Sequence, residues 1–149
     1  MERTQNDRHL FFIWNTLIPL FAGAGIYLVT SPDVIFVREM HTWGWYLSSG
    51  FETIPDTSLF RCIRYYLPDG LWGYSLMFAL SYLYDQEIKV LSSVVATVIC
   101  FSVIIECMQI LPTVPGTFDV VDIVMEIAAE TLAFYLIKRT TREGMCYED

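Results

Sequence analysis

Apolar residues along this chain of 149 residues gather into four long runs, separated by short polar stretches. The runs cover residues 10–29, 67–84, 90–111 and 120–137. The hydrocarbon core of a bilayer is about 30 Å thick, and a helix needs roughly 20 mostly apolar residues to cross it. The pattern therefore predicts an all-α integral membrane bundle of four transmembrane helices, in a single domain that covers residues 1–149.

The first run has a second interpretation, because Ala22-Gly23-Ala24 is similar to the small-residue cleavage site of a secretory signal. The apolar run continues past this site to Val29, which gives it the length of a crossing helix. We therefore expect a retained helix.

The segment of residues 30–64 differs from the runs around it, because it mixes charged residues with large aromatic ones. Tryptophan and tyrosine favour the headgroup region of a membrane, where an apolar ring and a polar edge can both be accommodated. We expect this aromatic-rich segment to lie at the membrane surface, partly as a short amphipathic helix. Its aromatic residues include Trp43, Trp45, Tyr46 and Phe51.

Composition agrees with this prediction and excludes several classes of function. The chain is 54% hydrophobic and 17% charged, with a mean hydropathy of +0.44, which leaves little charged surface for a soluble domain. A net charge of -8 argues against nucleic acid as a partner. The four cysteines are too far apart for a metal knuckle, and we expect no metal and no cofactor.

Lysine and arginine near the helix ends predict the orientation, because cytoplasmic loops of membrane proteins carry an excess of these residues. With the N-terminus inside, the cytoplasmic side would hold Arg3, Arg8, Lys89, Lys138, Arg139 and Arg142. The outer side would hold Arg38, Arg61 and Arg64. This difference favours a multi-pass protein of the cell membrane with both termini in the cytoplasm.

Acidic residues inside the last two runs are the most informative feature for function. Ionisable groups within a membrane are costly, so they usually face the interior of a bundle or a cavity and mark functional sites. Asp122, Glu126 and Glu130 are four residues apart, which places them on one helix face. At a rise of about 1.5 Å per residue, Glu106 and Glu126 lie at similar depth in an antiparallel hairpin.

These acids predict a polar pocket that opens to the outer side of the membrane. Its acids cannot all be ionised, so either some carry protons or a cation lies among them. Arg61 and Arg64 are the candidate cations from the protein itself. The alternative is structural: the acids would hold the helices together, and Asp119 and Asp122 would be helix caps. The candidate ligand-binding residues are Glu106, Gln109, Asp119, Asp122, Glu126, Arg64 and Asp69.

The same hairpin resembles the VanZ-like family of small multi-pass bacterial membrane proteins. The resemblance lies in Ile105-Glu106-Cys107-Met108-Gln109, followed by Pro115-Gly116-Thr117-Phe118-Asp119-Val120-Val121-Asp122. It extends to Tyr66-Leu67-Pro68-Asp69-Gly70-Leu71-Trp72, which is similar to the segment before an earlier helix of the family. Family members commonly have an arginine at the Gly116-Thr117 loop, an asparagine at Glu126 and a glycine at Ala129, so the pocket here is more acidic.

The resemblance implies a bacterial cell-envelope protein, since the family's namesake is associated with low-level resistance to the lipoglycopeptide teicoplanin. We expect it to bind an envelope component, a lipid-linked ligand or a glycopeptide-type antibiotic, besides membrane lipids. Three alternatives stay open: an enzyme on a lipid-linked substrate with Glu106 or Glu126 as general base, a small proton- or cation-coupled transporter, or a structural membrane subunit. Whether the protein is an enzyme, and its oligomeric state, are not determined by the sequence.

Overall fold

The computed structural model describes residues 2–30, 35–44, 57–84, 88–114 and 116–145, and all regular structure in these ranges is helical. This confirms the all-α prediction. The elements are α1 (Glu2–Thr30), α2 (Ile35–Thr42), α3 (Ser58–Arg61), the π-helical turn η1 (Cys62–Tyr66), α4 (Leu67–Leu83), α5 (Ile88–Met108) and α6 (Val120–Met145).

Several helix ends differ from the predicted ones, and α1 begins at Glu2 rather than at residue 10. α6 continues beyond Ile137 to Met145, because Lys138 and Arg139 end the apolar run but are themselves good helix formers. α5 ends at Met108 rather than at residue 111. After it the chain continues through turns with hydrogen bonds between residues three apart, such as the one from the Leu111 N–H to the Met108 carbonyl. Pro112 contributes to this change, because a proline disfavours the α-helical conformation in the residue before it.

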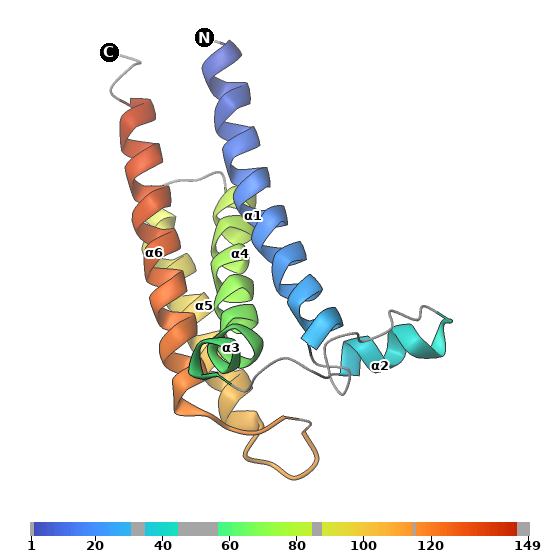
Figure 1. Cartoon of the computed structure of the whole chain (residues 1–149). Helices are drawn as coiled ribbons and strands as arrows, with labels where there is room; N and C mark the ends of the chain where they lie inside the picture. The colour runs from blue at the N-terminus through green and yellow to red at the C-terminus, as the bar shows by residue number, and fades with distance from the viewer. Residues whose placement is uncertain (1, 31–34, 45–56, 85–87, 115, 146–149) are drawn as a thin grey trace.

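The four long helices run alternately up and down, so both ends of the described chain lie at the same end of the bundle (Figure 1). α4 lies centrally and packs on α1 and α6, while α5 packs on α6 and on α4. The 109–119 loop and the segment with α2 and α3 lie at the opposite end from the termini (Figure 1).

The first helix is part of the core. Its Phe12 is fully buried against Phe78 of α4, with ring centroids 5.6 Å apart. Other core residues come from all three remaining long helices: Met77, Leu91, Val94, Val98, Ala133 and Ile137. α1 therefore packs as part of the bundle, through apolar contacts that would be lost without it.

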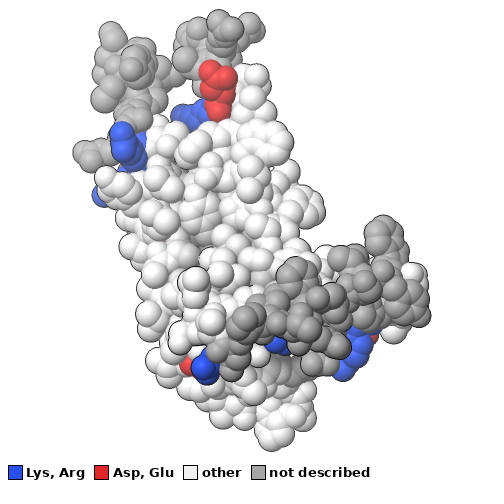
Figure 2. All heavy atoms as spheres, in the orientation of Figure 1, with Lys and Arg blue, Asp and Glu red and all other residues white. Residues whose placement is uncertain are grey.

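The face of the bundle seen in Figure 2 is apolar over its middle. In Figure 2 the charged residues lie at the two ends of the visible face, and the zone between them carries none. Exposed side chains of the bundle include Trp14, Phe21, Ile104 and Leu132, each more than half exposed. Two described helices, Asn6–Thr30 and Val90–Met108, are long and apolar enough to cross a membrane by length and composition. The fold therefore fits membrane association.

Between α1 and α4 the structure shows α2, α3 and η1, so a short helix is present where one was predicted. Arg38 and Trp43 are exposed there, Trp43 by 77%. Trp45, Tyr46 and Phe51, on which the predicted aromatic character also rests, lie outside the described residues.

Candidate functional site

The register between α5 and α6 is set by a buried hydrogen bond. The hydroxyl of Ser102 on α5 donates to Oε1 of Glu130 on α6 at 2.7 Å, and both residues are buried. One helical turn further along each antiparallel helix, this register places Glu106 opposite Glu126. The arrangement agrees with the predicted similar depth of these two acids.

Both carboxylate oxygens of Glu106 have partners. The Gln109 side-chain amide donates to Oε1 at 3.3 Å, and the backbone N–H of Asp119 donates to Oε2 at 3.4 Å. Gly116, at φ 125°, lets the loop pass directly against the Gln109 side chain, where a Cβ would collide with the amide. Glu106 and Gln109 therefore hold the loop that precedes α6.

Asp119 is the N-cap of α6. Its Oδ1 accepts the backbone N–H of Val121 at 2.8 Å, and its Oδ2 accepts the Tyr66 hydroxyl at 3.4 Å. The negative charge of Asp119, with some burial, raises the pKa of Tyr66 above its ordinary value, because a phenolate there would face a carboxylate. The cap interpretation is confirmed for Asp119.

Asp69, in the first turn of α4, is hydrogen-bonded to a residue of α1. The hydroxyl of Tyr27 donates to Asp69 Oδ1 across 42 positions of sequence. Asp69, Glu106 and Asp119 all lie near enough to Asp122 for their charges to interact with its carboxylate. Four elements thus contribute to one acidic cluster between the helices.

Three carboxylate oxygens of this cluster are buried and accept no hydrogen bond. They are Oδ1 of Asp122, Oε2 of Glu126 and Oε2 of Glu130, all on one face of α6. Glu130 is fully buried, against the backbone of α4: a Cβ on Gly73 would lie 3.2 Å from its Oε1. Buried acceptors without donors are costly, so these oxygens favour a ligand that donates hydrogen bonds or carries positive charge.

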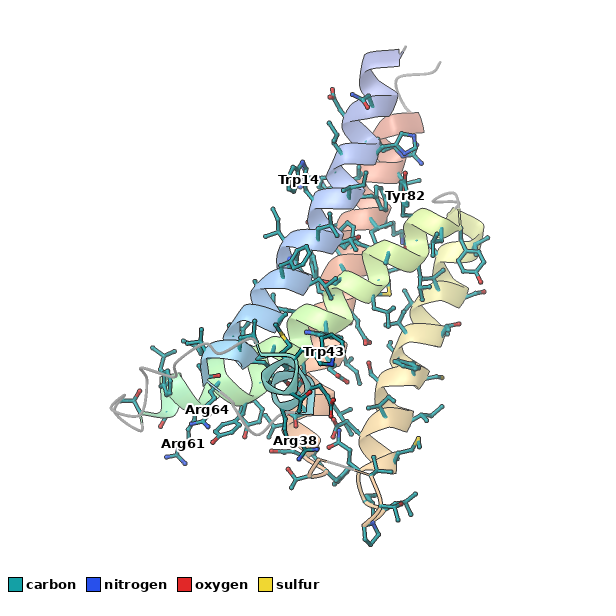
Figure 3. All side chains as sticks on the ribbon, turned by 90° about the vertical axis from the view of Figure 1, so that its right-hand side faces the viewer. Trp14, Arg38, Trp43, Arg61, Arg64 and Tyr82 are labelled. Carbon is teal, nitrogen blue, oxygen red and sulfur yellow. The ribbon has the colours of Figure 1, made fainter. Side chains whose placement is uncertain are left out.

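Arg64 contacts an aromatic ring near the end of the bundle. Its guanidinium carbon is 5.1 Å from the centroid of the Tyr65 ring, and its Nε is buried without a hydrogen-bond partner. Figure 3 places Arg38, Arg61 and Arg64 at one end of the bundle, away from its middle. An ion pair of Arg64 with the acids stays a prediction.

Sequence reasoning did not select three residues of the cluster. Glu130 is not among the candidate binding residues from the sequence, although it shares the helix face of Asp122 and Glu126. Ser102 lies one turn before Glu106, a spacing that could have indicated it. Tyr27 had no local signal, because its role depends on the pairing of α1 with α4.

No family model, curated protein or solved structure matches this chain. The resemblance to the VanZ-like family therefore rests on the motif residues themselves. Within the described ranges, no group of three histidine, cysteine or acidic residues could hold a metal ion.

Proposed function

We propose that this chain is a four-span, VanZ-like protein of the bacterial cytoplasmic membrane that binds a cationic or hydrogen-bond-donating component of the cell envelope at its acidic cluster. The apolar zone between two charged ends supports membrane insertion (Figure 2). Both termini lie at one end and the cluster lies toward the other, which suits cytoplasmic termini and an outward-facing site (Figure 1).

The three unpartnered oxygens on α6 carry the binding proposal. The acids that serve structure have donors: Glu106 holds the loop, Asp119 caps α6 and Asp69 binds Tyr27. Asp122 and Glu126 lie between these contacts, each with one buried oxygen that no protein group satisfies. A bound ammonium group, with several N–H donors, would supply the missing bonds.

A purified sample in lipid nanodiscs tests this proposal with butylammonium chloride as the probe. We expect butylammonium to raise the midpoint temperature of unfolding, and tetramethylammonium chloride at equal concentration to have less effect because it has no N–H donor. Glu126→Gln should remove the stabilisation, whereas Asp7→Asn, at an exposed acid near the start of α1, should keep it. Equal stabilisation by both salts, or an unchanged response of Glu126→Gln, would refute the proposal.

For the glycopeptide class, the probe is teicoplanin and the measurement is growth. Expression of the chain in a susceptible bacterium is expected to raise the tolerated teicoplanin concentration, and Glu126→Gln expressed at the same level should not. If both forms protect equally, the acidic cluster does not act on this antibiotic.

A proton-coupled transporter is a second candidate, favoured by Glu130. This residue is fully buried, bonded through one oxygen only, and lies at the inner limit of a series of acids that begins at Asp119. Proteoliposomes with an enclosed pH-sensitive dye test it under an imposed pH gradient. Transport predicts proton flux that Glu130→Gln abolishes; no flux above that of empty liposomes would exclude this candidate.

A further inference from the structure

A cavity of about 520 Å³ lies on the face of α4 that is flanked by α1 and α5. Most of its wall is apolar, including Leu20 of α1, Leu76 and Ala79 of α4, and Phe101 of α5. The volume is within the usual range of small-molecule sites, about 300–1,000 Å³.

The exposure of three lining residues indicates that this cavity opens on the side of the bundle. Trp72, Phe101 and Ile105 line it and are themselves 47%, 54% and 41% exposed. These side chains belong to the apolar surface that would face lipid. A ligand dissolved in the bilayer therefore has a direct path into the cavity.

The floor of the cavity reaches the acidic cluster. Asp69, Ser102 and Glu126 line it, and one buried oxygen of Glu126 has no donor. The fully buried Glu130, with its own unpartnered oxygen, lies directly behind Ser102 and Gly73, which also line the cavity. The ionisable residues that line it are the acids Asp69 and Glu126, and none of its described lining residues is a lysine or arginine, so the cavity favours a cation over an anion.

A second cavity of about 530 Å³, between α1, α4 and α6, provides a matched comparison. It is lined by Trp14, Ile18, Ala128 and Leu132 among others, and no acidic residue lines it. Its polar residues Asn15 and Tyr74 bond each other at 2.7 Å. The two cavities thus have nearly equal volume, but only the first combines an apolar wall with acidic lining residues.

We infer that the first cavity binds a membrane-dissolved amphiphile, with its hydrocarbon chain against the apolar wall and its protonated amine at Glu126 and Asp69. The inference rests on the proposed function and names its ligand class. The wall matches a chain, the carboxylates match an ammonium group, and the opening on the side of the bundle matches entry from the bilayer.

The test uses the full chain in nanodiscs with dodecylamine as the probe and dodecanol as the neutral control, at equal mole fraction in the lipid. A charge-assisted hydrogen bond is stronger than a neutral one, so half-maximal stabilisation should need about tenfold less dodecylamine than dodecanol, which corresponds to about 1.4 kcal/mol. Ala79→Phe, or Ile105→Trp at the rim, should weaken this response. Ala128→Phe, which fills the comparison cavity, should not.

Contact with the wall is measured with a chain-brominated dodecylamine, which quenches nearby tryptophan. Trp72 lines the acidic cavity and Trp14 lines the comparison cavity. Because both tryptophans are also partly exposed on the apolar surface, dodecanol with the same bromination is the reference for quenching from the bilayer. The amine should quench more than this alcohol, and the excess should disappear in Trp72→Phe and persist in Trp14→Phe. The reverse pattern would place the amine in the comparison cavity and overturn the inference.

The probes separate failure of the inference from failure of the proposed function. If butylammonium stabilises the protein but dodecylamine does so no better and quenches no tryptophan, the cluster binds cations and the cavity holds no chain. If dodecanol equals dodecylamine, the amine assignment is wrong. If neither amine stabilises the protein, the proposed function falls, and the inference with it.

Discussion

At the scale of single residues, the deepest acid depends on a glycine. Glu130 is fully buried and receives one hydrogen bond, from Ser102. It fits between α4 and α6 because Gly73 has no side chain, and a Cβ there would lie 3.2 Å from Oε1 and 3.3 Å from Cγ of Glu130. The carboxyl group is held on two sides and has little space to move.

Gly73→Ala is therefore expected to destabilise the protein. Overpacking should outweigh the gain in helix propensity and lower the free energy of unfolding by about 1 kcal/mol. Gly25→Ala is the matched control: no atom lies within 4 Å of its added Cβ, so it should leave stability unchanged or raise it slightly. Thermal unfolding in nanodiscs measures both, and equal stability of the two variants would contradict the packing argument.

At the scale of elements, the loop and first turn of α6 form one unit. Asp119 caps the helix with its side chain and binds Glu106 through its backbone N–H. Gly116 brings the loop onto Gln109. The motif residues Glu106, Gln109, Gly116 and Asp119 thus have a structural explanation that is independent of any ligand.

Replacement of Asp119 tests its role as a cap. Asp119→Ala removes the acceptor for the Val121 N–H and should lower the free energy of unfolding by about 1 kcal/mol, whereas Asp119→Asn should retain most of the stability because asparagine caps equally well. Unfolding curves of both variants provide the comparison. Equal losses would show that the charge of Asp119, rather than its capping bond, is what stabilises the fold.

The glycine of the same loop offers a separate test. Gly116→Ala is expected to lower the free energy of unfolding by about 1–3 kcal/mol, because the added Cβ is strained at φ 125° and collides with the Gln109 side chain. Gly44→Ala has strain alone, at φ 83° with no atom within 4 Å of the added Cβ, and should cost less. Combining Gly116→Ala with Gln109→Ala should recover part of the loss; additive losses would disprove the contact.

At the scale of the whole molecule, charge is separated along the bundle axis. The visible charged groups occupy the two ends, with Arg38, Arg61 and Arg64 opposite the termini (Figures 2 and 3). This separation follows from the cost of charge in hydrocarbon and from the bundle's alternating direction. It leads to a definite prediction of topology.

Labelling of single cysteines in intact cells tests the four-span proposal. In a chain whose four native cysteines are replaced, a membrane-impermeant maleimide should label Thr57→Cys and Thr113→Cys, which are exposed at one end. Asn6→Cys, exposed at the other end, should react only after permeabilisation. Labelling of Thr57→Cys without Thr113→Cys would exclude four spans, and labelling of Asn6→Cys alone would invert the orientation.

The sequence by itself determined the helical class and the approximate extent of the four long helices, because runs of apolar residues and their proline and charged boundaries are local signals. It also determined that Asp122, Glu126 and Glu130 share a face, since a four-residue spacing has this meaning on any helix. Helix ends were less predictable: α6 passes Ile137 because charge stops an apolar run without stopping a helix.

Only the tertiary structure decided which acids are satisfied. The contacts of Tyr27 with Asp69, and of Ser102 with Glu130, depend on which helices pair and in which register, and no local pattern specifies either. The cavity beside Glu126 exists because α1 and α5 flank α4 without closing over it. The acidic residues can be read from the sequence, but helix packing decides which of their carboxylate oxygens receive a hydrogen bond and which do not.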